Sequence, residues 1–106
     1  MPKYLLEASY TLDGIKGLKA EGGSARVAAV MEATEAAGGK VESMYFAFGN
    51  NDVYIIVDYP DNVTAAGAAL AVTATGGARA RTVVLLTAAE VDAAVKMGST
   101  YRPPGS

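Results

Sequence analysis

The sequence has no cysteine and no histidine among its 106 residues. Without cysteine, the chain has no disulfide, no thiolate nucleophile and no thiolate ligand for a metal. Without histidine, it lacks the side chain that most often acts as a general base near neutral pH. Any proton transfer would fall to carboxylates or tyrosines, and we expect neither a cofactor nor a metal site.

Long apolar runs and an excess of basic residues are also missing. No stretch approaches the roughly 20 apolar residues that a membrane-spanning helix needs, and the polar start MPKYLLEASY does not fit a signal peptide. Nine Lys and Arg stand against eleven Asp and Glu, which gives a net charge of −2. We therefore expect no nucleic-acid partner, no membrane partner and a cytoplasmic location.

Apolar residues, in contrast, make up 51% of the chain. A chain of this length suits one compact core, so we expect residues 1–106 to form a single domain. The apolar content is high for such a small domain and indicates surface that another subunit covers. The partner that we expect is a second copy of the chain, in a homodimer or a larger homo-oligomer.

Strand-like and helix-like segments follow one another in the order β-α-β-β-α-β. Residues 11–23 are punctuated by glycine and are expected to form a loop, in which Ile15 and Leu18 are spaced for one apolar turn. The predicted strands are 3–10, 41–49, 52–59 and 80–86. The predicted helices are 25–37 after the cap Ser24, a second from Asp61 or Asn62 to about Thr75, and a short one between the capping box Thr87–Glu90 and Gly98.

This order predicts an α+β fold of the ferredoxin-like type. Two helices would cover one face of a four-stranded antiparallel sheet, with the short C-terminal helix as an addition. The second helix consists mostly of small residues, which allow a helix to approach a sheet closely. Its inward stripe is predicted to be Val63, Ala66, Gly67, Leu70, Ala71 and Ala74.

The hairpin between residues 41 and 59 decides which side chains share a face of the sheet. Asn50 and Asn51 are predicted to form a two-residue type I′ turn, because Asn tolerates the left-handed backbone of that turn. In this register Phe48 pairs with Val53, and Ser43 pairs with Asp58. The apolar face expected under the helices carries Met44, Phe46, Phe48, Val53, Ile55 and Val57, and the other face carries Ser43, Tyr45, Ala47, Tyr54, Ile56 and Asp58.

The second face holds the candidate site. Glu7 of the first strand is expected there as well, and two such faces packed together would enclose a cavity. Burial in that cavity would raise the pKa of a carboxylate toward that of a general base, or the same groups would only satisfy one another's hydrogen bonds across an interface. The ligand-binding candidates are Glu7, Ser43, Tyr45, Tyr54, Ile56 and Asp58, of which Glu7, Asp58, Tyr45 and Tyr54 are also the catalytic candidates.

Four segments resemble the GYD-domain family, which takes its name from a Gly-Tyr-Asp element. These are MPKYLLEASYT, YFAFGNNDVYIIVDYPDN, LLTAAEVD and YRPPG, which together extend over nearly the whole chain. The resemblance implies a ferredoxin-like fold that pairs into a dimeric α/β barrel, and it supplies no reaction. Asn51 stands between Gly49 and Asp52, where the family's tyrosine is expected. We interpret this tip mainly as turn chemistry, with a functional loop as the alternative.

Three weaker patterns are considered, of which the first is rejected and the other two are less favoured as sites. Residues 17–24 have the glycine spacing of a P-loop, but Gly23 occupies the position of its lysine. The basic side chains Arg79, Arg81, Lys96 and Arg102 are more typical of solvated surface. The carboxylates of Asp52, Asp58 and Asp61 follow no metal-loop signature.

The predicted function is a small homo-oligomeric α/β-barrel module that binds a small molecule or serves in assembly. One alternative is a cofactor-independent enzyme of the isomerase, monooxygenase or lyase type. It would act on a small hydrophobic or aromatic compound, with Glu7 or Asp58 as the base. The other alternative is a regulatory ligand-sensing module. The stiff tail from Tyr101 to Pro104 is expected to pack on a neighbouring subunit, to close a cavity mouth or to remain disordered.

Overall fold

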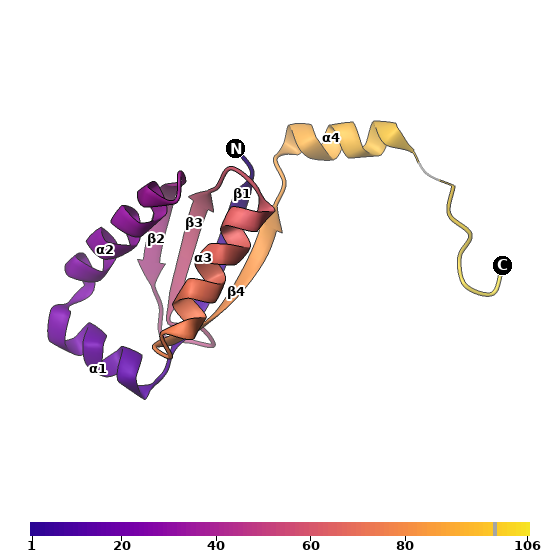
Figure 1. Ribbon diagram of the computed structural model, residues 1–106. Coiled ribbons are helices and arrows are strands. Elements are labelled where there is room, and N and C mark those ends of the chain that lie inside the picture. Colours follow the sequence, from indigo (N-terminus) through magenta and orange to yellow (C-terminus); the bar gives the residue numbers. More distant parts are fainter. Residues whose placement is uncertain (99) are drawn as a thin grey trace.

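The computed structural model describes residues 1–98 and 100–106. Four strands form one antiparallel sheet in the order β2-β3-β1-β4, and helices α2 and α3 lie on one of its faces (Figure 1). This arrangement confirms the predicted ferredoxin-like α+β fold. The elements are β1 (Lys3–Tyr10), α1 (Leu12–Glu21), α2 (Gly23–Ala36), β2 (Lys40–Phe46), β3 (Val53–Asp58), α3 (Asn62–Ala74), β4 (Ala78–Leu85) and α4 (Ala88–Met97).

Helix α1 occupies the segment that the sequence predicts to be a loop. The Thr11 hydroxyl accepts a hydrogen bond from the Gly14 amide and starts this helix. Glycine lowers helix propensity, so the glycines of this segment argue against a helix in the sequence. Gly14 is nevertheless required by packing, because an added Cβ would overlap the carbonyl oxygen of Gly77. Gly22, with φ of 86°, ends α1 and is the N-cap of α2, so the prediction of Ser24 as the cap is wrong.

Two helix starts follow the predicted capping chemistry. The Asp61 carboxylate accepts a hydrogen bond of 2.8 Å from the Thr64 amide at the start of α3. At α4 the Glu90 amide donates to the Thr87 hydroxyl, and the Thr87 amide donates to the Glu90 carboxylate. These bonds to the ionised carboxylates lower the pKa of Asp61 and of Glu90. Both predicted helix starts are confirmed, and α4 extends away from the sheet (Figure 1).

No helix in the described part of the chain is long and apolar enough to cross a bilayer.

The predicted inward stripe of α3 is wrong. Val63 and Leu70 are 80% and 70% exposed, whereas Ala65 is buried and Ala68 packs against the core. The helix has no charged side chains, and its apolar residues occur on all sides, so its periodicity does not mark one face as the inner one. The outer surface of α3 is therefore apolar and exposed.

The pairing of β2 with β3 differs from the predicted register by two residues. Tyr45 pairs with Tyr54 and Phe46 with Val53. The strands are joined by a loop that the Ala47 amide closes with a hydrogen bond of 2.8 Å to the Asp52 carbonyl. No described residue other than glycine has a positive φ, so the predicted type I′ turn is absent. A shift of two residues is one full period of a strand, and the predicted faces of these strands are therefore kept. Phe48 leaves the sheet and is fully exposed.

A β-bulge at Glu42 alters the other end of the same pair. Val41 pairs with Val57 and Ser43 with Ile56, so one extra residue lies in β2 between them. The predicted pair of Ser43 with Asp58 is wrong because of the two-residue shift, and the bulge places Lys40 opposite Asp58.

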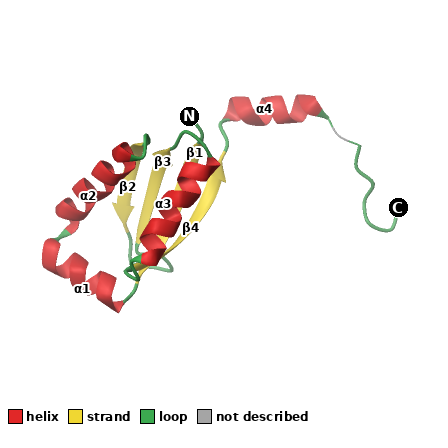
Figure 2. Ribbon diagram, viewed as in Figure 1, coloured by secondary structure: helices red, strands yellow, loops and turns green. Residues whose placement is uncertain are grey.

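The core lies on the helix side of the sheet. Tyr4 and Val57 have the largest fully buried side chains, and the Tyr4 hydroxyl donates a hydrogen bond to the Asn62 side chain at the start of α3. The rings of Tyr4 and Tyr59 pack at 6.0 Å between centroids. The remaining core members are Ala8, Val53, Ile55 and Ala65. Of the predicted apolar face, Val53, Ile55 and Val57 lie in the core and Met44 packs against it, whereas Phe46 is 38% exposed. No helix of the described residues covers the opposite face (Figure 2).

Candidate functional site

A row of polar side chains crosses the uncovered face of the sheet. Its members, one from each strand, pair in the order Tyr45, Tyr54, Glu7 and Arg81. Neighbouring strands lie roughly 4.8 Å apart, so the row is on the order of 15 Å wide. The structure therefore brings together three of the predicted site residues and adds an arginine beside Glu7.

Asn51 completes this row from the hairpin loop. Its side chain is only 7% exposed. Its Nδ2 donates to Glu7 Oε2 at 3.1 Å and to Tyr54 Oη at 3.3 Å, and its Oδ1 accepts from Ser9 Oγ at 3.3 Å. We call Glu7, Ser9, Asn51 and Tyr54 the amide cluster. Asn51, predicted from the sequence to be a turn residue, is thus the centre of the polar network. The only signal for this role in the sequence is that Asn51 stands where the tyrosine of the GYD family is expected.

A small cavity of about 320 Å³ opens beside the amide cluster. Arg79 and Arg81 of β4 border it, opposite Ser9 and Glu7 of β1. Two guanidinium groups near one carboxylate favour a ligand that is polar or negatively charged. The structure places these two arginines at the cavity, whereas Lys96 lies in α4 and Arg102 in the C-terminal tail.

Asp58 lies apart from the amide cluster. The Lys3 ammonium contacts Asp58 Oδ1 at 2.9 Å and Glu42 Oε1 at 2.8 Å. Hydrogen bonds to Glu42 and Asp58 raise the pKa of Lys3. Asp58 is four positions along β3 from Tyr54, which pairs with Glu7, and this corresponds to about 13 Å. The two predicted carboxylates therefore do not share one site.

A row that is apolar except for Ser43, called the apolar row, separates the amide cluster from the ion pairs of Lys3. Ser43, Ile56, Leu5 and Val83 pair across the four strands between them. Ser43 and Ile56, both predicted to bind ligand, therefore lie between the amide cluster and the Lys3 ion pairs. This row gives the middle of the uncovered face an apolar surface.

The rest of the hairpin tip holds the loop in place. The Asp52 carboxylate accepts a 2.8 Å hydrogen bond from the Tyr10 amide, and the Asp52 amide donates to the Ala8 carbonyl. Gly49 is exposed and has open space around it. Asp52 therefore fixes the loop on β1, which places Asn51 over the sheet.

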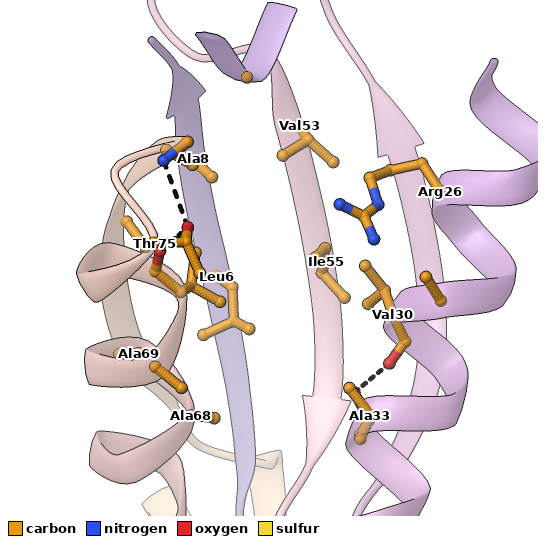
Figure 3. Close-up of a pocket in the computed structure, with 18 of the residues that line it drawn as sticks. Leu6, Ala8, Arg26, Val30, Ala33, Val53, Ile55, Ala68, Ala69 and Thr75 are labelled. Carbon is orange, nitrogen blue, oxygen red and sulfur yellow. Dashed lines mark hydrogen bonds between the residues drawn. The ribbon is translucent and has the colours of Figure 1, made fainter. Parts of the chain in front are cut away.

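A second, larger concave space lies on the opposite, helix-covered face. Helix α2 packs along β2 and α3 along β4, and between them a groove of about 870 Å³ opens over β1 and β3 (Figure 3). Its floor is apolar, and Arg26 extends from α2 into it. The sequence does not predict this groove, because two helices are expected to cover the whole face of the sheet. The small side chains of α3 are the one signal of open space, since they leave the neighbouring volume unfilled.

Comparison with known proteins identifies the family. The family model described as GYD domain matches residues 4–95, which include all four strands, the hairpin with Asn51 and most of α4. No curated protein and no solved structure matches the chain. The matched segment is far more than half of the sequence, and it contains the elements that build both faces of the sheet. The chain therefore belongs to the GYD domain family.

Proposed function

We propose that the protein is a homo-oligomeric binding module. The uncovered sheet face of one copy packs against the same face of a second copy, and the two faces enclose a small-molecule site beside the amide cluster. The observation that carries this proposal is the exposed apolar and aromatic surface around the buried, hydrogen-bonded Asn51. On this face Tyr45 is 72% exposed, Val83 40% and Tyr54 36%.

The physics of sheets supports pairing of this face. A sheet that carries apolar side chains on both faces needs cover on both, and here helices cover one face only. A two-fold axis would place the apolar row of one copy against that of the other, since such an interface uses the same patch twice. Packed sheets lie about 10 Å apart, which leaves room for side chains from both copies and for a small ligand.

The chemistry of the amide cluster favours binding. Asn51 donates to both Glu7 and Tyr54, so these groups are held in fixed positions. Tyr45 offers an aromatic surface next to them, and Arg81 offers a positive charge. A small aromatic compound with an acidic or hydrogen-bonding substituent would satisfy all of these groups at once.

A cofactor-independent enzyme is the second candidate, and the cavity beside Glu7 favours it. In such an enzyme Glu7, rather than Asp58, would act as the base. Asp58 lies 2.9 Å from the Lys3 ammonium, and this ion pair already occupies its carboxylate. Glu7 borders a space that a substrate can enter, as a general base must.

Helix α4 and the tail supply a second contact in this assembly. Val91 and Val95 of α4 are 45% and 75% exposed, and the helix extends away from its own sheet (Figure 1). Tyr101 in the tail is also exposed. A neighbouring copy would cover these apolar side chains, in the way that subunits cover exposed patches in other oligomers.

The test is the molar mass in solution of two matched variants. Val83→Lys places a charge on the uncovered face, and Val63→Lys places the same charge on the exposed outer surface of α3. By size exclusion with light scattering at micromolar concentration, we expect wild type and Val63→Lys to be dimers or larger, and Val83→Lys to be a monomer. Circular dichroism checks that both variants fold. A monomeric wild type, or equal masses for the two variants, would contradict the proposal.

A further inference from the structure

The groove between α2 and α3 is open because the two helices pack along opposite edges of the sheet. Its floor is formed by β1 and β3, which contribute Leu6, Ala8, Val53 and Ile55. Val30 of α2 and Ala68 of α3 line its walls (Figure 3). The volume of about 870 Å³ is in the range of sites that take small organic molecules. The 13 residues of α3 give the groove a wall of about 20 Å, which suits an elongated molecule.

One cation interrupts this apolar surface. Figure 3 shows the Arg26 guanidinium extending from α2 toward β3, near Val53. Its Nε is buried and has no hydrogen-bond partner among the described residues. Glu21 Oε1 lies 3.2 Å from this nitrogen, close enough for an ion pair but without the geometry of a hydrogen bond. The Arg26 side chain as a whole is 37% exposed, so its other N–H donors face the open side of the groove, while the buried Nε is a donor of the kind that is normally paired.

The surroundings of Arg26 determine what kind of partner would pair with it. Tyr10 lines the same groove, and burial raises the pKa of its hydroxyl, which therefore stays protonated as a donor. Two donors at a groove with an apolar floor match a ligand that has an acceptor at one end and an apolar body. Carboxylates accept two parallel hydrogen bonds from a guanidinium, which makes them the best fit for Arg26.

We infer that this groove is a second binding site, which takes an elongated apolar carboxylate with its head group on Arg26. The site does not depend on the function proposed above, since it lies on the other face of the sheet. Glu21 holds the guanidinium when the groove is empty and gives way to the ligand carboxylate. Because Glu21 carries the same charge as the ligand, its removal should strengthen binding.

Isothermal titration of the full chain with dodecanoate tests this inference. Dodecanol serves as the neutral probe of the same length, and both are kept below the concentrations at which they aggregate. We expect dodecanoate to bind about tenfold or more tightly than dodecanol, since hydrogen bonds to charged groups are the stronger ones. Arg26→Gln should remove this preference, and Glu21→Gln should increase it. Arg102→Gln, which removes the same charge from the exposed tail, should leave it unchanged.

Methyl shifts in a nuclear magnetic resonance titration locate the ligand. We expect dodecanoate to shift Ile55 and Ala68 in the groove and to leave Val83 on the uncovered face unchanged. Equal affinity for the acid and the alcohol, or an unchanged preference in Arg26→Gln, would overturn the role of Arg26. Shifts at Val83 alone would place the ligand on the other face and overturn the site.

The alternative occupant of the groove is helix α4 of a second copy of the chain, and the titration distinguishes it from the carboxylate. Its apolar residues Val91 and Val95 are exposed and one helical turn apart. If α4 fills the groove, wild type should bind no dodecanoate, and Val95→Asp should bind it because the groove is vacated. That result would overturn the carboxylate site and assign the groove to the neighbouring subunit.

Discussion

The two faces of this sheet hold sites of opposite character, although the residues of both alternate along the same strands. On the helix side, Val53 and Ile55 form an apolar floor, and a single cation, Arg26, reaches over it. On the uncovered side, Tyr54 and Glu7 belong to a polar network that Asn51 holds together. The first space exists because the helices leave the middle of the sheet open. The second exists because nothing in the described chain covers that face.

This difference shows how strand alternation separates two kinds of chemistry within a few residues. Ile55 contributes to the core and to the groove, while its neighbour Ile56 belongs to the apolar row of the other face. Stability and apolar binding are therefore located on one side, and assembly and polar recognition on the other. Changes at adjacent positions should affect different properties.

The largest expected effect comes from Ile55→Ala, with Ile56→Ala as the matched comparison. Ile55 is 7% exposed in the core, so its truncation should lower the free energy of unfolding by about 2–4 kcal/mol. The half-buried Ile56 should cost less, and its unfolding midpoint should depend on protein concentration, because subunit association is affected. Urea unfolding at two protein concentrations measures both. Equal costs, with no dependence on concentration, would show that the two faces do not differ as described.

A smaller effect is expected from Asn51→Leu. This change leaves Glu7, Tyr54 and Ser9 without their common partner, which should cost about 1–3 kcal/mol in urea unfolding. Asn50→Leu is the control, since the Asn50 side chain is exposed and its change should stay within about 0.5 kcal/mol. If Asn50→Leu destabilised the protein as much as Asn51→Leu, the loop backbone rather than the amide cluster would be responsible.

The smallest effect concerns the ion pairs of Lys3, measured as stability against pH. The folded protein raises the pKa of Lys3 above 10.5, through hydrogen bonds to Glu42 and Asp58. Its contribution is therefore complete below pH 10.5 and is lost as the pH rises through the higher folded value. Thermal unfolding between neutral and alkaline pH should show a shallower loss in Lys3→Met than in wild type. Identical slopes would mean that these surface ion pairs do not stabilise the fold, and added salt should reduce any difference.

The features that sequence predicts well are those set by neighbouring residues. The starts of α3 and α4 follow from Asp61 and from the Thr87–Glu90 box, because a cap is formed within one helical turn. The faces of β2 and β3 follow from alternation and are correct despite the wrong register. The grouping of Glu7, Tyr45 and Tyr54 on one face was predictable for the same reason.

The features that sequence does not predict depend on distant contacts. The register of the hairpin depends on the Ala47–Asp52 loop closure and on the bulge at Glu42. The separation of Asp58 from Glu7 depends on pairings between strands that are far apart in the sequence. The rotation of α3 is hidden because its apolar residues occur on all sides of the helix and none of its residues is charged. The groove is set by the spacing of α2 and α3.

The central claim is that a second copy covers the uncovered face, and the absence of cysteine permits a direct measurement. Tyr45→Cys on this face and Leu70→Cys on the outer side of α3 replace side chains of similar exposure, 72% and 70%. Each variant accepts one spin label per chain. Electron paramagnetic resonance should show strong dipolar coupling between the labels at position 45 and much weaker coupling at position 70. Absence of coupling at position 45, or stronger coupling at position 70, would contradict the account.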